Sequence, residues 1–198
     1  MSIKKFATEI RREQIAQAAV ELIASQGMKG FNMAGLAHQV DVAPSAIYHH
    51  FKNKDEVIDA VLDHLQNRLL GNVRSVLART PHPLDQLQQL LEAHVELVVG
   101  HSAMPRILFS EDINGGKSES RSRLNDIIMR YIHELASIFR QGQHLRVIRP
   151  ELDPEALAVM FLGLLQPTAI LWHLSDGEFD AQKQVEKGWS IFSEAIRP

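Results

Sequence analysis

Apolar residues recur at steps of three and four along the whole chain, and no stretch alternates between apolar and polar with a period of two. This pattern predicts α-helices throughout and no strands, so the expected fold class is all-α with about nine helices. The expected helices cover approximately residues 8–25, 33–40, 44–51, 84–98, 103–114, 120–141, 153–174 and 180–196, and one more helix is expected to start near Asn53 or Lys54 and to end before Thr80.

Glycine, proline and asparagine give several of these helices their expected ends. Gly27 is placed as the C-cap of the first helix, and Asn32 as the N-cap of the second. Pro44 lies in the first turn of the third helix, where its missing N–H costs no hydrogen bond. Gly142 is expected to stop the long helix before it, and Pro167 to kink the apolar helix that contains it.

Composition limits the class of protein. A chain of 198 residues, 45% of them hydrophobic, can bury one sizeable core or two small ones. It has no cysteine, which excludes disulfides and thiolate metal sites. The N-terminus continues from Lys4 and Lys5 into charged, helix-periodic sequence and not into the apolar stretch of a secretory signal, so a cytoplasmic protein is expected.

The net charge of −3 is unevenly distributed. Residues 1–54 carry seven lysines and arginines against four acidic residues, whereas the rest of the chain carries 14 against 20. A basic N-terminal part on an acidic remainder favours contact between that part and a polyanion. Two ordinary solvated surfaces give the same asymmetry, so it gains weight only together with a binding motif.

A helix-turn-helix is predicted at the second and third helices. Only residues 41–43 separate them, and in this motif the second member enters the DNA major groove with its N-terminus first. Ser45, Tyr48 and His49 lie near one face of the third helix and can bond to phosphates or base edges.

Two lysines follow this helix at a place that suits a DNA backbone. Lys52 and Lys54 bracket the start of the fourth helix, where positive charge and free backbone N–H groups both favour a phosphate. The full set of DNA-binding candidates is Asn32, Met33, Ala43, Pro44, Ser45, Tyr48, His49, Lys52 and Lys54.

The stretch FNMAGLAHQVDVAPSAIYHHFKNKDEVIDAVL, from residue 31 to 62, resembles the DNA-binding head of the TetR/AcrR family of bacterial repressors. The preceding helix REQIAQAAVELIASQGMKG does so too, and the remainder fits the family in length and pattern. The resemblance implies a homodimer with a DNA-reading domain, taken as residues 1–53, and an effector-binding and dimerisation domain, residues 54–198.

Two residues of the turn depart from the family's pattern. Asp41 stands where the family usually has Gly, and Ala43 where it has Ser. Asp tolerates a left-handed backbone better than most residues, so the turn is expected to form. Ala43 has no side-chain oxygen to cap the third helix, which should cost about 1 kcal/mol.

Several histidines are candidates for chemistry. Adjacent residues such as His49 and His50 point about 100° apart on a helix, so their rings do not converge on one metal ion. His94 and His101 share the apolar stripe of the fifth helix, but a rise of about 10.5 Å over two turns prevents a common ion. They are either core histidines or polar anchors in an effector pocket. His133 is expected in solvent, and no metal, cofactor or catalytic residue is predicted.

Twenty residues from 156 to 175, ALAVMFLGLLQPTAILWHLS, carry no formal charge. This length approaches that of a membrane span, but Gln166 and His173 argue against one. A helix that is apolar on all sides is otherwise buried on all sides. We therefore predict that the helices over about 153–174 and 180–196 form the interface of a homodimer.

The predicted effector domain has mostly apolar candidates for a pocket, which favours a lipophilic effector. Most are equally good core residues. The candidates are Leu65, His94, Val98, Met104, Phe109, Ile128, Tyr131, Ile132, Leu135, Met160, Leu164 and Thr168.

The predicted function is a ligand-responsive repressor that binds a near-palindromic operator as a dimer and is released by a small effector. The alternatives are a helical dimeric binding protein or an enzyme, either with a degenerate DNA-binding head. No paired carboxylates, Ser/His/Asp set, HxxxH pair or Gly-rich phosphate loop marks the effector domain, which disfavours the enzyme.

Overall fold

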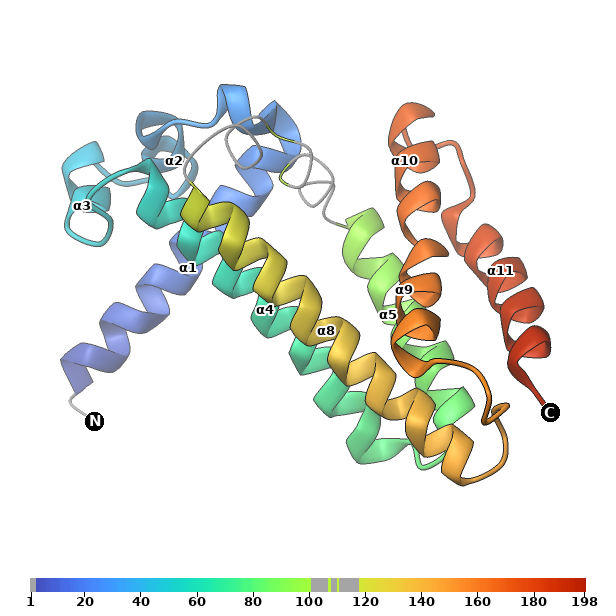
Figure 1. Ribbon diagram of the computed structural model, residues 1–198. Coiled ribbons are helices and arrows are strands. Elements are labelled where there is room, and N and C mark those ends of the chain that lie inside the picture. Colours follow the sequence, from blue (N-terminus) through green and yellow to red (C-terminus); the bar gives the residue numbers. More distant parts are fainter. Residues whose placement is uncertain (1–2, 101–106, 108–109, 111–117) are drawn as a thin grey trace. The chain divides into compact units, whose positions relative to one another are not determined.

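The structure is a computed structural model, and it describes residues 3–100, 107, 110 and 118–198. Every secondary-structure element in these ranges is a helix, which confirms the predicted all-α class (Figure 1). The chain forms two compact units, one of residues 1–68 with 101–124 and the other of residues 69–100 with 125–198.

The helices α4 (Lys54–Arg79) and α8 (Ser118–His144) contribute to both units. The compact units are therefore cut at other places than the functional domains predicted at 1–53 and 54–198. The first turns of α4 belong to the unit that holds the predicted DNA-binding motif. The division of functions between 1–53 and 54–198 stays a prediction.

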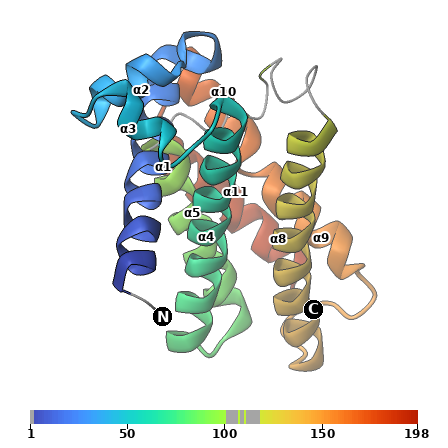
Figure 2. The same cartoon turned by 90° about the vertical axis from the view of Figure 1, so that its left-hand side faces the viewer.

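The first unit contains α1 (Ile3–Gly30), α2 (Met33–Gln39) and α3 (Pro44–Tyr48) with the beginning of α4. The helix α2 packs against both α1 and α3 (Figure 2). The largest side chains of this core are almost completely buried: Ile15, Ile23, Leu36, Ile47, Phe51 and Leu62.

The helix α1 begins at Ile3, five residues before the predicted start. Its regular course is interrupted at Gly27, whose φ of 72° and ψ of 172° lie in a region that only glycine readily adopts. The prediction of a helix break at this glycine is confirmed, and the chain makes a further helical turn up to Gly30.

The second unit is formed by α5 (Pro83–Gly100), α9 (Pro154–Gly163), α10 (Gln166–Leu174) and α11 (Ala181–Ile196), with the adjoining parts of α4 and α8. The helix α10 packs against α5, α9 and α11. Four aromatic rings join α8, α9 and α11 in the interior, with neighbouring centroids 6.1–6.3 Å apart: Phe139, Phe161, Trp189 and Phe192.

The helix predicted over 153–174, with a kink at Pro167, is divided into two helices. The chain breaks at Leu164 and Leu165 into α9 and α10, and Pro167 lies in the first turn of α10. Proline has no N–H to donate to the carbonyl four residues earlier, and its ring crowds that carbonyl. By length and composition Pro154–Leu174 could cross a membrane, with a mean hydropathy of 1.6, but such a segment is weak evidence because core helices pass the same test.

Gly142 was predicted to stop its helix, and this prediction is wrong because α8 continues to His144. A Cβ atom on Gly142 would lie 2.5 Å from Cδ1 of Ile148. The glycine thus allows the buried Ile148 side chain to pack directly on the α8 backbone. The chain reverses after the helix at Arg146, whose φ is 57°.

Candidate functional site

The two helices of the predicted DNA-binding motif meet at a tight turn. Asn32 caps α2 as predicted, because its Oδ1 accepts a hydrogen bond of 2.8 Å from the Gly35 N–H. Asp41 adopts the left-handed backbone with a φ of 53°, so it replaces a turn glycine. Ala43 precedes α3 with no side-chain hydrogen bond to the helix. The turn forms, and α3 lacks its cap.

One side of α3 is fixed in the core and the other is open to solvent. Ile47 is completely buried, whereas Ser45 and His49 are exposed and the Tyr48 side chain is 52% exposed. The helix ends at Tyr48, three residues before the predicted end, and Phe51 then turns into the core. The structure therefore brings Ser45, Tyr48 and His49 together on one accessible surface.

The two lysines that follow α3 differ in their surroundings. The Lys52 side chain is 86% exposed, and its Nζ lies 3.8 Å from a Glu56 carboxylate oxygen. The Lys54 Nζ donates to the Met28 carbonyl at 3.3 Å and lies 5.6 Å from the centre of the Phe31 ring. Lys52 is thus directed to solvent, while the Lys54 amine is directed to the end of α1.

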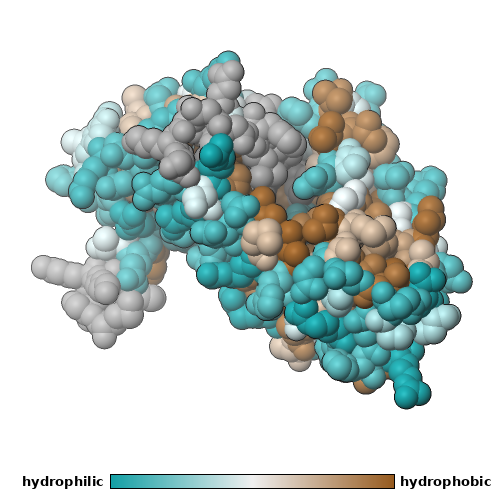
Figure 3. Space-filling view, in the orientation of Figure 1, coloured by the Kyte–Doolittle hydropathy of each residue, from teal (hydrophilic) through white to brown (hydrophobic). Residues whose placement is uncertain are grey.

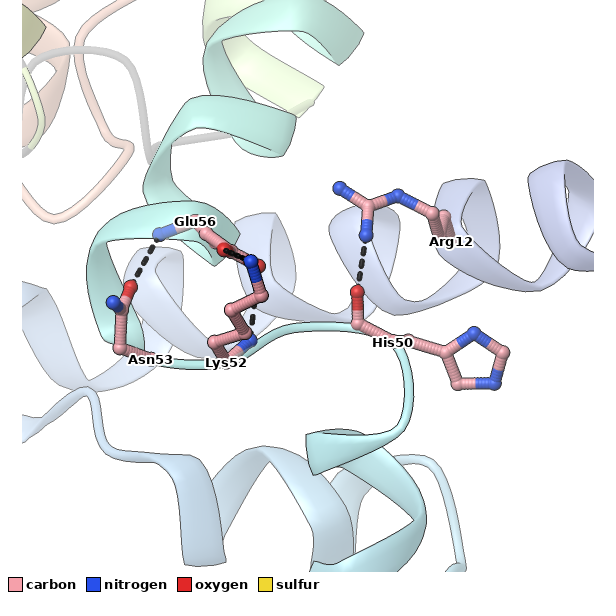
Figure 4. A network of polar contacts seen from close by, with 5 residues as sticks. All are labelled: Arg12, His50, Lys52, Asn53 and Glu56. Atoms are coloured by element: carbon pink, nitrogen blue, oxygen red, sulfur yellow. Dashed lines mark hydrogen bonds and ion pairs between the residues drawn. The ribbon is translucent and has the colours of Figure 1, made fainter.

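Arg12 also belongs to this region, although it is not among the residues predicted from the sequence. Its Nη1 donates to the His50 carbonyl (Figure 4). Its guanidinium lies 4.1 Å from the centre of the Phe51 ring. Burial, with the charges of Arg11 and Arg12, lowers the pKa of His50, so its imidazole is neutral at pH 7. Nothing in the spacing of residues pointed to Arg12, because its partners lie 38 and 39 positions away along the chain.

Three polar side-chain contacts hold α4 within the first unit, and no pattern in the sequence predicts them. His64 is buried and its Nδ1 lies 2.5 Å from a Glu13 carboxylate oxygen on α1. Arg123 at the start of α8 pairs with Asp59, at 3.6 Å, and with Asp63. The helix that follows the DNA-binding motif is therefore tied both to α1 and to α8.

The predicted effector residues fall into three groups. Four are buried and four are half-buried: Leu65, Tyr131, Leu135 and Thr168, then His94, Ile128, Ile132 and Leu164. Leu65 belongs to the first unit and the others to the second. Met160 is 60% exposed on α9 in the single chain, and its part in an effector pocket stays a prediction. Met104, Phe109, His101 and the Val98 side chain lie outside the described residues.

His94 and Tyr131 form a polar pair inside the second unit. The His94 Nδ1 lies 3.4 Å from the Tyr131 hydroxyl, and the two rings are tilted with centroids 5.5 Å apart. Burial lowers the pKa of His94 from 6.5 to about 4 and raises the pKa of Tyr131. Both side chains are therefore uncharged at neutral pH. His133 is exposed, as predicted.

Comparison with protein families decides the class of the chain. Residues 15–61 match the family described as bacterial regulatory proteins, tetR family, and residues 62–195 match the family described as YsiA-like protein, C-terminal region. The chain belongs to the tetR family of bacterial regulatory proteins. The predicted function as a DNA-binding transcriptional regulator is confirmed.

Relatives and solved structures of tetR-family proteins cover almost the whole chain. The fatty acid metabolism regulator protein of Bacillus subtilis (strain 168) is 25% identical over 167 residues, 84% of this chain and 86% of the relative. The nucleoid occlusion factor SlmA of Vibrio vulnificus (strain YJ016) is 22% identical over 188 residues, 94% and 96% of the two chains. The crystal structure of FadR from Bacillus subtilis in complex with stearoyl-CoA has a TM-score of 0.80 at 23% identity, covering 93% of this chain and 98% of that one.

The depressed pKa of His94 predicts a pH-dependent stability. Below pH 6.5 the unfolded chain binds a proton at His94, whereas the folded chain binds it only near pH 4. The free energy of unfolding therefore decreases as the pH falls from 6.5 to 4. Urea unfolding should show the wild type losing about 2 kcal/mol more than a His94→Phe variant between pH 7 and pH 5. The exposed His133, replaced by Gln, controls for the loss of a histidine. Equal losses in wild type and His94→Phe would contradict an enclosed imidazole.

Proposed function

We propose that this tetR-family protein is a homodimeric repressor that reads a near-palindromic operator with the exposed side of α3. The main support for this proposal is that Ser45, Tyr48 and His49 share an accessible surface on a helix whose opposite side is buried. Regulators of this family bind DNA operators and small-molecule effectors and act as dimers. They are soluble and act in the cytoplasm, where this protein would bind the nucleoid.

In this proposal the side chains of the motif have different tasks. Ser45, Tyr48 and His49 contact base edges or nearby phosphates, and the exposed Lys52 contacts a phosphate. Pro44 and Ala43 position the N-terminus of α3 close to the DNA backbone, and Asn32 and Met33 position the N-terminus of α2 in the same way. Since the Lys54 amine bonds to the Met28 carbonyl, its part in DNA binding is to fix the start of α4 or, after reorientation, to add a further phosphate contact.

For the effector we propose a fatty acyl-CoA thioester. The support is the Bacillus subtilis relative named for fatty acid metabolism and the related structure titled as a stearoyl-CoA complex. The interior candidates are mostly apolar, which suits an acyl chain. The uncharged His94 and Tyr131 suit a neutral hydrogen-bonding group such as a thioester carbonyl better than a carboxylate. Because α4 belongs to both units, it can carry a change from one to the other.

The dimer interface that we propose is the outer face of α9, α10 and α11, which fall within the predicted ranges 153–174 and 180–196. Large apolar side chains on this face are 41–75% exposed in the single chain: Val159, Met160, Ile170, Leu171, Leu174 and Ile191. Figure 3 shows apolar side chains gathered on the surface over α10. A contiguous apolar patch of this kind is typical of a protein interface. A Cβ atom on Gly163 would have no described atom within 4 Å apart from its own helix backbone, so a partner can approach closely there.

A second candidate function is a DNA-binding protein of the nucleoid that responds to no effector. The relative named nucleoid occlusion factor favours it, because it matches 94% of this chain. Both candidates require DNA binding, and they differ only in whether a small molecule releases the DNA.

Substitution of Tyr48 tests whether α3 contacts the operator. Tyr48→Ala should weaken binding to the duplex that the wild type selects from a random-sequence pool by about 1–3 kcal/mol, because a base or phosphate contact is lost. Gel-shift titration measures the affinity, and sizing checks that the dimer persists. Leu77→Ala, which truncates a comparably exposed side chain on α4 outside the motif, is the control. An unchanged affinity in Tyr48→Ala would refute the assignment of α3.

Release of the selected duplex tests the effector. Stearoyl-CoA, below its micelle concentration, should lower the fluorescence anisotropy of labelled duplex bound to the protein, whereas CoA and stearate should not. The His94→Phe variant should need a higher concentration, because it lacks the polar partner for the thioester carbonyl. Equal release by stearate would overturn the thioester, and no release by any acyl-CoA would favour the effector-independent candidate.

Substitutions that introduce a charge on the apolar face of α9, α10 and α11 test the proposed dimer interface. Leu171→Glu and Ile191→Glu should convert the protein to monomers in sedimentation velocity, because a buried carboxylate at the interface has no partner. Met129→Glu on α8, where the side chain is 54% exposed, is the matched control and should stay dimeric. Dimers in both interface variants would place the interface elsewhere.

A further inference from the structure

The position of α3 depends on contacts outside the helix itself. Its five residues are too few to be stable alone, and Ala43 gives it no side-chain cap. Ile47 and Phe51, both completely buried, anchor one side. These apolar contacts hold the helix against the core, but they resist sliding and tilting less well than directional bonds do.

Arg12 supplies a directional contact at the C-terminal exit of α3. Its guanidinium donates to the His50 carbonyl and lies over the Phe51 ring, so one side chain of α1 holds two successive residues after the helix. A planar guanidinium can stack with its face while it donates from its edge, which an ammonium group cannot do. Figure 4 shows the Arg12 side chain reaching from α1 to this backbone.

The same segment is held from the other side by α4. The Asn53 Oδ1 accepts a hydrogen bond of 2.9 Å from the Glu56 N–H, and the Glu56 carboxylate accepts one of 2.9 Å from the Lys52 N–H. This reciprocal arrangement resembles a capping box and fixes the backbone that enters α4. Residues 50–53 are therefore fastened to α1 at one end and to α4 at the other.

We propose that Arg12 is a positioning residue for operator recognition, which acts by fixing the exit of α3 and not by contacting DNA. This rests on the proposed reading of DNA by α3. Because Ser45, Tyr48 and His49 project from so short a helix, a small tilt would move all three relative to the bases. Recognition of one sequence would suffer, while general attraction to phosphates would remain.

Arg11 provides the matched control. It is the next residue of α1, it has the same charge and it is also half-buried. Its Nη1 donates to the Gln14 side chain of its own helix at 3.0 Å. A Lys substitution at either position keeps the positive charge and removes the planar guanidinium group. Only Arg12→Lys also removes the contacts to His50 and Phe51.

The experiment measures fluorescence anisotropy with two labelled duplexes over a range of salt concentrations. One is the duplex that the wild type selects from a random-sequence pool, and the other has a random sequence of the same length. Arg12→Lys should weaken binding to the selected duplex about tenfold, as expected for loss of a charge-assisted hydrogen bond that places specific contacts. Its affinity for the random duplex and its salt dependence should match the wild type, and Arg11→Lys should match the wild type throughout.

Three results would overturn the inference. A smaller salt dependence in Arg12→Lys would indicate a direct phosphate contact. An equal loss on both duplexes would indicate a less folded domain, and so would faster amide hydrogen exchange throughout α1 and not only in residues 44–51. Wild-type affinity for both duplexes would show that Arg12 does not position α3. If the wild type selects no sequence at all, the proposed function fails first, and this inference with it.

Discussion

A five-residue helix is not stable on its own, and the proposed recognition of DNA by this protein depends on such a helix. The backbone of α3 gains few hydrogen bonds for the residues it fixes, and its N-cap position carries an alanine. Its geometry therefore comes from its surroundings. Buried Ile47 and Phe51 attach one side to the core, Asp41 provides the left-handed turn before it, and Arg12 holds its exit. What remains outside is a small surface with the side chains that we propose to contact DNA.

The second unit uses its helices for two different purposes. Its interior is held by the aromatic rings of Phe139, Phe161, Trp189 and Phe192, and the His94–Tyr131 pair lies elsewhere in the unit, uncharged. The proposed interface on α9, α10 and α11 also carries large apolar side chains, and these are exposed among the residues that the structure describes. An interior with neutral polar groups favours a lipophilic effector, and an apolar outer face favours a second copy of the chain. The break before Pro167 lets the two halves of the apolar segment pack in different directions.

Much of this arrangement could be read from the sequence because it is local. The three- and four-residue spacing indicated the helices, Asn32 and Gly27 marked helix ends, and the motif around Pro44 indicated a helix-turn-helix. The errors have physical causes. Pro167 broke a helix that was expected to bend, and Gly142 proved to be a packing contact for Ile148 and not a stop. Met160 follows the apolar pattern and yet is exposed in the single chain, because hydropathy alone does not distinguish a core position from a surface position.

The contacts that fix α3 and α4 could not be predicted in the same way. Arg12 with His50, Glu13 with His64 and Arg123 with Asp63 join residues far apart in the chain, and each involves side chains that look like ordinary surface residues. Periodicity describes which face of a helix is buried, but it does not tell which charged side chain reaches across to another helix.

The most direct test of the account is methylation interference on the duplex that the protein selects. Methyl groups on guanine N7 occupy the major groove, where the side chains of α3 would meet base edges. If two copies of α3 read the DNA, N7 methylation should block binding at two positions whose centres lie about one helical turn apart. Binding that is unaffected by N7 methylation, or blocked at a single position, would contradict the central claim.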